Sequence, residues 1–199
     1  MIMLNVTRYT LDVLHAGYAK CSLHRLMIVP LLGLFLSCEV PTEAYDNPLD
    51  EEVAAEKGID TPALVFFPDK FDGVTAGSSV SVQLYALEVV GVTGAYIQLA
   101  YDKSKISISN VNAGDFFGSA PIFIYENDPD NGLLNIYSSF LGSDSSSTVS
   151  GTGNLATLVL GTITAGQSTL NYTVETQIVD AQDNPVVLNG LGEGVIDVQ

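Results

Sequence analysis

Residues that could do acid–base or nucleophilic chemistry near neutral pH are confined to the start of this 199-residue chain. Both histidines, His15 and His24, and both cysteines, Cys21 and Cys38, lie within the first 38 positions. Histidine is the side chain whose unperturbed pKa lies near neutrality, and the thiolate is a common nucleophile and metal ligand. Beyond Cys38 the sequence therefore offers no Ser-His-Asp triad, no cysteine nucleophile and no Cys or His metal site.

Carboxylates are the remaining candidates for catalysis. After Cys38, 22 acidic residues accompany four lysines. A glycosidase site made of two carboxylates is the one enzyme alternative, but among so many acids a pair at hydrolase spacing is expected by chance. We therefore predict a protein that is not an enzyme and that needs no cofactor. The acidic balance also argues against nucleic acid as a partner, because a polyanion repels such a surface.

A different chemistry is offered by two segments in which tyrosine stands beside amides and hydroxyls. Tyr96 and Gln98 are two residues apart in the first segment. The second segment has the same spacing from Asn135 to Tyr137 and from Tyr137 to Ser139. In a strand this spacing places side chains on one face. Because tyrosine provides contact area and a hydrogen bond at small entropic cost, such a face is typical of a recognition surface. We predict that these five residues bind a partner; the alternative is an ordinary solvated sheet face.

The two segments have the alternation of half-buried strands, with apolar side chains on the opposite face. Each segment would bury every second residue and leave the tyrosines and amides outside. The predicted inward residues are Ala95, Ile97, Leu99 and Tyr101 in the first segment and Leu134, Ile136 and Ser138 in the second.

The same alternation recurs along the chain from residue 63 onward, between turns rich in Gly, Asn, Asp and Pro. Regularly spaced strands without helical segments predict an all-β fold, a nine-stranded antiparallel β-sandwich with jelly-roll topology. The nine predicted strands are Ala63 to Phe67, Ser79 to Val90, Ala95 to Tyr101, Ile106 to Val111, Ile122 to Tyr125, Leu133 to Phe140, Asn154 to Ile163, Ser168 to Thr176 and Gly194 to Val198.

The N-terminal region has the layout of a secretion signal. Residues 26–37 form an apolar run that follows Lys20, His24 and Arg25 and is too short to span a membrane as a helix. The run ends in Leu36-Ser37-Cys38, which resembles the lipobox of bacterial lipoproteins. This resemblance implies lipidation of Cys38 and a place in the bacterial cell envelope, exposed at the outer surface and anchored by lipid alone. The alternative is a plain signal peptide or core helix with an incidental cysteine.

An acidic segment follows the signal region. Residues 39–61 contain two prolines and many acids, with little that could fill a core, which predicts a flexible, self-repelling linker. A short helix over Leu49 to Lys57 is the alternative. The predicted organisation is thus a signal region over residues 1–38, a linker over 39–61 and one β-sandwich domain over 62–199.

Several segments of the sandwich region together match a known family in their order and spacing: Ala76 to Val82, Gly94 to Asp102, Val111, Gly114 to Phe116, Gly151 to Leu158 and Gly194 to Val198. On these segments the region resembles the cohesin modules of bacterial cellulosomes. The resemblance implies a nine-stranded jelly roll that binds a calcium-loaded dockerin module through one sheet face, in assemblies that degrade polysaccharides. A carbohydrate-binding module of the related β-sandwich superfamily is the alternative, although such modules often present tryptophan and this chain has none.

One acidic turn could hold calcium. Glu126 to Gly132 reads ENDPDNG, but it lacks the distal glutamate of hand-type calcium loops. We therefore expect a plain turn there, and we expect any calcium requirement of binding to lie in the partner.

Overall fold

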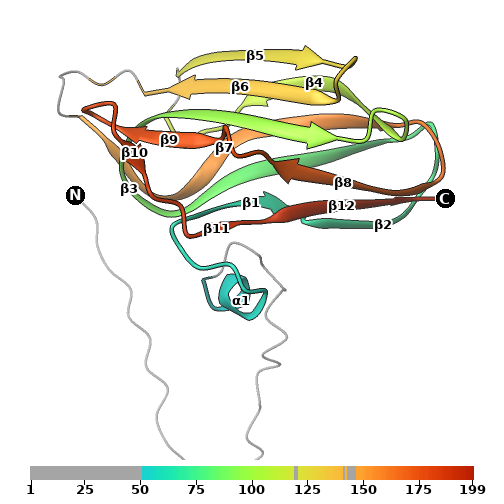
Figure 1. The fold of residues 1–199 in the computed structure, drawn as a ribbon, viewed down its shortest axis with the longest axis horizontal. Coiled ribbons are helices and arrows are strands. Elements are labelled where there is room, and N and C mark those ends of the chain that lie inside the picture. The colour runs from blue at the N-terminus through green and yellow to red at the C-terminus, as the bar shows by residue number, and fades with distance from the viewer. Residues whose placement is uncertain (1–50, 119–120, 141, 143–146) are drawn as a thin grey trace, which may run out of the picture. The chain divides into compact units, whose positions relative to one another are not determined.

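The computed structural model describes residues 51–118, 121–140, 142 and 147–199. Within these residues a short helix, α1 (Glu51–Glu56), precedes twelve strands (Figure 1). The signal region and Cys38 lie outside the described residues. In the described part of the chain, no helix has the length and apolarity needed to cross a membrane.

The strands follow one another along the chain with short connections. They are β1 (Ala63–Phe67), β2 (Lys70–Val74), β3 (Ser79–Tyr101), β4 (Ile106–Ala113), β5 (Ile122–Asp128), β6 (Leu133–Ser139), β7 (Val149–Thr162), β8 (Gly166–Tyr172), β9 (Gln177–Asp180), β10 (Pro185–Val186), β11 (Gly190–Leu191) and β12 (Glu193–Val198).

The all-β prediction is confirmed, but the division into strands differs from the expected nine. Two predicted strands form one continuous strand, β3, which passes through Glu88 at φ 48° and Gly91 at φ 70° without ending. Strands β2, β9, β10 and β11 were not predicted. All four have five residues or fewer, and β10 and β11 have two residues each, which is too short for the apolar alternation on which the prediction depends.

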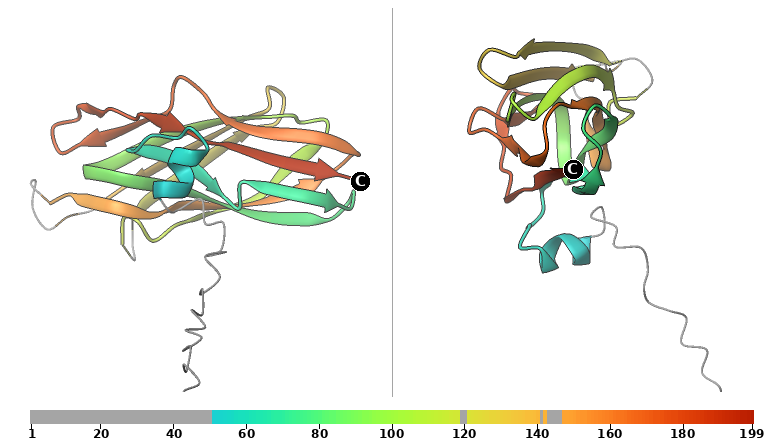
Figure 2. Two further views of the ribbon diagram at one scale, coloured as in Figure 1. Left: turned by 90° about the horizontal axis from the view of Figure 1, so that it is seen from below. Right: turned by 90° about the vertical axis from the view of Figure 1, so that its right-hand side faces the viewer.

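Two layers of sheet face each other, and β3 belongs to both. The N-terminal half of β3 pairs with β1 and β7, and β7 pairs with β4. The C-terminal half of β3 pairs with β6 on one side and with β8 and β9 on the other, and β6 pairs with β5. Figure 2 shows the two layers from below and from one end. The long strand therefore holds both layers together.

The core between the layers is apolar, as sheet-on-sheet packing requires. Leu84 from the first half of β3, Ile97 and Leu99 from its second half and Leu158 from β7 are fully buried. All of the predicted inward residues of β3 and β6 are buried, including the hydroxyl-bearing Ser138. The predicted assignment of faces is therefore confirmed for both strands.

The C-terminal part of the predicted linker is folded. Ala54 in α1 is buried against Ala63, Val65 and Leu87, with Ile59 beside them. Lys57 also pairs with Asp69 at 2.8 Å. Over residues 51–56 the observed structure is therefore the short helix that was the alternative to an extended linker. Ala54 and Ile59 stabilise it by packing on an apolar patch on the outer side of β1 and β3. Figure 1 shows α1 beside this layer.

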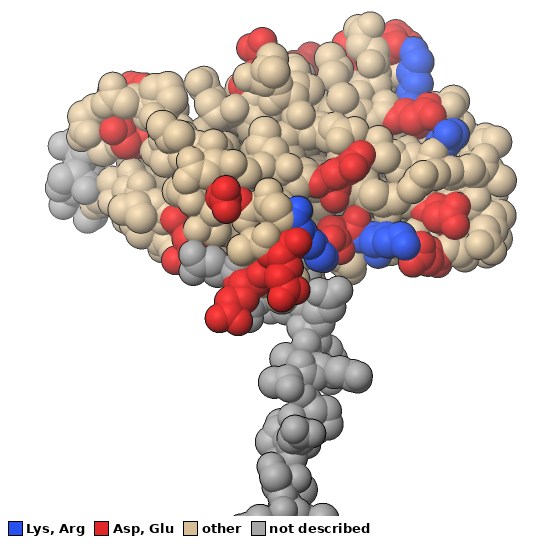
Figure 3. All heavy atoms as spheres, turned by 60° about the horizontal axis from the view of Figure 1, so that its bottom comes forward, with Lys and Arg blue, Asp and Glu red and all other residues tan. Residues whose placement is uncertain are grey.

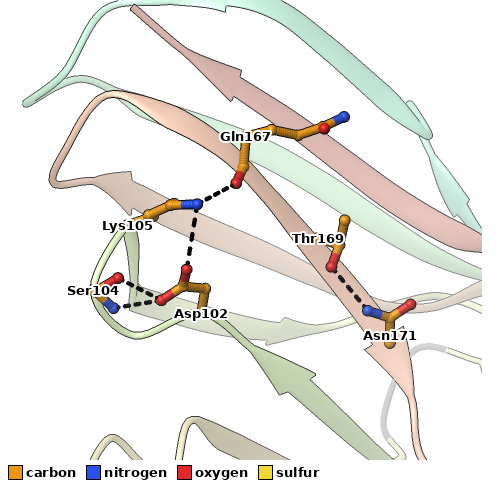
Figure 4. A network of polar contacts seen from close by, with 6 residues as sticks. All are labelled: Asp102, Ser104, Lys105, Gln167, Thr169 and Asn171. Atoms are coloured by element: carbon orange, nitrogen blue, oxygen red, sulfur yellow. Dashed lines mark hydrogen bonds and ion pairs between the residues drawn. The ribbon is translucent and has the colours of Figure 1, made fainter.

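Hydrogen bonds stabilise the turns at the strand ends. Asp102, directly after β3, accepts hydrogen bonds from the backbone and hydroxyl of Ser104, and Lys105 reaches across to the carbonyl oxygen of Gln167 in β8 (Figure 4). In the ENDPDNG turn, Asp128 accepts two hydrogen bonds from Asn131. This is the geometry of the plain turn favoured by the sequence.

Candidate functional site

The two tyrosines predicted to bind a partner lie directly opposite each other on neighbouring strands. Tyr96 of β3 is the register partner of Tyr137 of β6. Their rings stack, with centroids 4.8 Å apart and planes 19° from parallel. A stacked cross-strand pair of this kind adds about 0.5–1.5 kcal/mol beyond the area that it buries. Each ring therefore holds the other in a fixed position on the sheet.

The two predicted amides form the next pair along the same strands. Gln98 lies opposite Asn135, and its Nε2 donates to the Asn135 Oδ1 at 2.9 Å. The same oxygen accepts a bond of 3.0 Å from the Tyr96 hydroxyl. Thr173 in turn donates its hydroxyl to the Gln98 Oε1 at 2.8 Å. These bonds fix the orientation of both amides, so the surface is ordered before any partner arrives.

Ser139 completes the set at the end of β6. It lies opposite Gly94, and its hydroxyl donates to the Thr93 carbonyl oxygen at 3.1 Å. The structure thus brings all five predicted residues onto the outer face of one sheet, where Tyr137 is exposed and the other four are half-buried. We call this surface the tyrosine face (Tyr96, Gln98, Asn135, Tyr137 and Ser139).

Two apolar neighbours of this face on β5 were not predicted from the sequence. Ile122 lies opposite Ser139 and Ile124 opposite Tyr137, and these isoleucines are 47% and 60% exposed. Their spacing of two residues was a signal that they share a face. The sequence did not show which face, because that depends on the pairing of β5 with β6.

A shallow hollow of about 270 Å³ lies beside the tyrosine pair. Gly94 forms part of it, and a Cβ atom at that position would lie 3.3 Å from the Val179 Cγ2. Ile122 and both tyrosines line the same hollow. Since most of its lining is apolar, the hollow suits an apolar side chain from a partner.

The charge around the tyrosine face is neutral to negative. Burial, followed by the neighbouring Tyr137, raises the pKa of the Tyr96 phenol, which therefore stays protonated and donates its hydrogen bond. The four lysines of the described chain lie elsewhere: Lys57, Lys70 and Lys105 pair with carboxylates, and Lys103 reaches the Asp130 carbonyl oxygen. Figure 3 shows basic side chains lying beside acidic ones on the side of the molecule that carries α1.

Ordered tyrosines and amides on one sheet of a β-sandwich have the surface chemistry that protein interfaces use. The cohesin domain model matches residues 65–190, and the chain belongs to the cohesin domain family. The family is a non-catalytic protein–protein interaction module, so the prediction that the chain is not an enzyme is confirmed. Cohesins are typically extracellular or cell-surface components. A comparison with curated proteins found no match.

Solved cohesin structures share the fold at low sequence identity. The third cohesin of ScaC from Acetivibrio cellulolyticus, solved with the ScaB dockerin, is 16% identical with a TM-score of 0.59, over 68% of this chain and 97% of that one. A non-cellulosomal cohesin from the archaeon Archaeoglobus fulgidus is 16% identical with a TM-score of 0.54, over 69% and 91% of the two chains. The OlpC cohesin from Clostridium thermocellum, solved with a dockerin, is 16% identical with a TM-score of 0.55, over 69% and 94%.

Proposed function

We propose that this chain binds a dockerin-type protein module through its tyrosine face. The observation that carries the proposal is the stacked pair of Tyr96 and Tyr137, held in place by the hydrogen bonds of Asn135 and Gln98. Rigid aromatic side chains beside fixed polar groups lose little entropy on binding, which is the usual property of interface hot spots. The dockerin complexes formed by the ScaC and OlpC cohesins support this choice of partner.

The geometry of the tyrosine pair favours a protein partner over a polysaccharide on this face. Sugars pack on the open faces of aromatic rings, whereas Tyr96 and Tyr137 cover one face of each other. The adjacent hollow and the exposed isoleucines add apolar area that a protein side chain can bury. The carbohydrate-binding alternative therefore has less support on this face.

The localisation proposed for this module is the bacterial cell envelope. Lipid attached at Cys38 would hold the chain at the outer surface, and residues 39–50 would act as an acidic spacer before α1. The sandwich would then be presented to soluble partners that carry dockerins. The proposed organisation is then a signal region over residues 1–38, a spacer over 39–50 and a folded domain that includes α1 as well as the sandwich predicted over 62–199.

Titration calorimetry against a panel of recombinant type I and type II dockerins, each loaded with calcium, tests the function. The full chain should bind at least one of them. Tyr96→Ala and Tyr137→Ala should each lower the affinity roughly 30-fold, because truncating a hot spot typically costs about 2 kcal/mol or more. Tyr125→Ala, at an exposed tyrosine outside the tyrosine face, is the matched control and should bind like the wild type. The proposal is wrong if no dockerin binds or if both face variants keep the wild-type affinity.

A further inference from the structure

A second hollow, of about 350 Å³, lies on the layer that does not carry the tyrosine face. It forms where the ladder between β3 and β7 shifts its register between Leu84 and Tyr85, so that Tyr85 lies opposite Asn154. Tyr85 follows the buried Leu84 and therefore points away from the core. We call this site the Tyr85 hollow; its polar and aromatic lining consists of Tyr85, Asp115, Phe116, Ser150, Thr152 and Asn154.

The backbone around the Tyr85 hollow is fixed closely. The loop after β4 is bonded to the bulged part of β7, since Gly114 N–H donates to the Leu155 carbonyl at 3.0 Å and Phe116 N–H to the Asn154 carbonyl at 2.9 Å. A Cβ atom at Gly114 would lie 2.0 Å from the Asn154 backbone oxygen, so only glycine allows the loop and β7 to come this close together. Asp115, between the two bonded residues, is thereby held at the rim of the hollow.

One buried polar atom of the hollow has no partner. The Asn154 Oδ1 makes no hydrogen bond among the described residues, and the Asp115 carboxylate lies beside it in the lining. Burial, followed by the Asp115 carboxylate, raises the pKa of the Tyr85 phenol, which keeps the phenol neutral. None of the four lysines in the described residues lines the hollow. Buried polar atoms in folded proteins usually have a partner, so the Asn154 oxygen and the Asp115 carboxylate suit a ligand that donates hydrogen bonds.

The aromatic part of the hollow is also held in position. The Tyr85 ring meets the Phe67 ring edge-on, with centroids 6.2 Å apart and planes at 84°. The hydroxyls of Ser150 and Thr152 are already engaged, with the backbone of Gly91 and with Glu88 respectively. A ligand would therefore meet one ordered ring, one carboxylate and one amide.

We propose that the Tyr85 hollow binds a neutral saccharide unit, which packs against the Tyr85 ring and donates hydroxyl hydrogens to Asp115 and Asn154. An anionic ligand would be repelled by Asp115, with no lysine to offset it, and an apolar ligand would leave the acceptors unpaired. A pyranose has both an apolar C–H face and several O–H donors. The inference does not rest on the proposed dockerin binding, because it concerns the other layer and other residues.

The test is calorimetric titration of the full chain with three neutral oligosaccharides, cellohexaose, xylohexaose and mannohexaose, without any dockerin. At least one should bind. Tyr85→Leu keeps an apolar side chain beside Phe67 but removes the ring and phenol, and should lower the affinity about tenfold or more. Asp115→Asn, at an exposed position, should weaken the same interaction while leaving the melting temperature unchanged.

Tyr125→Leu serves as the control for a nonspecific effect of losing an exposed tyrosine, and it should bind the sugar as the wild type does. The inference is overturned if none of the three oligosaccharides binds the full chain. It is also overturned if binding occurs but neither Tyr85→Leu nor Asp115→Asn weakens it. A dockerin titration of the same variants should be unaffected, which separates this site from the tyrosine face.

Discussion

The Tyr96 hydroxyl donates a hydrogen bond of 3.0 Å to the Oδ1 of Asn135, across the boundary between β3 and β6. This diagonal contact connects the stacked tyrosine pair to the amide pair one step further along the strands. Four side chains of the tyrosine face therefore form one connected unit. Replacing one member of such a unit is expected to change the energetic contribution of the others.

The first prediction concerns coupling between the two stacked rings. The free energies of unfolding of Tyr96→Ala, Tyr137→Ala and the double variant should deviate from additivity by about 0.5–1.5 kcal/mol, since the stacking contribution can be lost only once. Urea denaturation of the full chain measures all four species. The pair Tyr96 and Tyr125 is the control and should be additive; additivity in both cycles would contradict the ring contact.

The second prediction compares a buried with an exposed position of β3. Leu99 is fully buried between the layers, so Leu99→Ala should cost about 2–5 kcal/mol of stability through lost transfer energy and a residual cavity. Val90 lies on the same strand but is 71% exposed, and Val90→Ala should change the stability by no more than about 0.5 kcal/mol. Thermal melting followed by circular dichroism distinguishes the two. Equal effects would mean that the faces of β3 are assigned wrongly.

The third prediction concerns close backbone approach. Gly114→Ala places a methyl group against the backbone of Asn154 and Leu155, which cannot move without breaking the hydrogen bonds that hold the loop. Gly161→Ala meets only hydroxyl oxygens of Ser107 and Ser109, which can rotate away. We expect a clear drop in melting temperature for Gly114→Ala and a small one for Gly161→Ala. The reverse order would refute the described loop geometry.

The fourth prediction follows from the carboxylate of Asp180. Hydrogen bonds from the backbone of Asn184 and then of Gln182 lower the pKa of Asp180 below its usual value. A lowered folded-state pKa stabilises the fold at pH values above the unfolded pKa, near 4, and this stabilisation is lost as the pH falls through the folded-state value. Asp180→Asn should therefore melt below the wild type at neutral pH, with a difference that shrinks in acid.

A charge control is needed for this comparison, because removing any acid from so acidic a chain also relieves repulsion. Glu193→Gln removes one negative charge at an exposed position of β12. The difference in melting temperature between Glu193→Gln and the wild type should not shrink in the same way between pH 7 and acid. A constant deficit of Asp180→Asn at all pH values would show that the charge of Asp180 contributes nothing to the turn.

The fifth prediction concerns the proposed lipid anchor. If Cys38 is the acylated residue, metabolic palmitate label should enter the protein and the protein should fractionate with membranes. Cys38→Ala should lose the label and either leave the membrane fraction or accumulate unprocessed. Cys21→Ala is the matched control and should retain both properties. Labelling that persists in Cys38→Ala would exclude this residue as the attachment site.

Part of the tyrosine face could be predicted because strand alternation is a local property. Along Ala95 to Tyr101 the apolar residues occupy every second position, so the outward positions of Tyr96 and Gln98 follow from the sequence alone. The alternation in Leu133 to Ser139 places Asn135, Tyr137 and Ser139 outward in the same way. No comparable pattern showed the short edge strands β10 and β11, which contain two residues each.

The sequence by itself determined the all-β class, the burial of the two strand faces and the absence of cysteine and histidine chemistry after Cys38. Only the tertiary structure decided which tyrosines stack, that Ile122 and Ile124 border the tyrosine face, and that Tyr85 and Asn154 meet. The physical reason is that a side chain's direction follows from its own strand, with a period of two residues. Its neighbours follow from the register between strands, which is set by turns, bulges and packing across the whole domain.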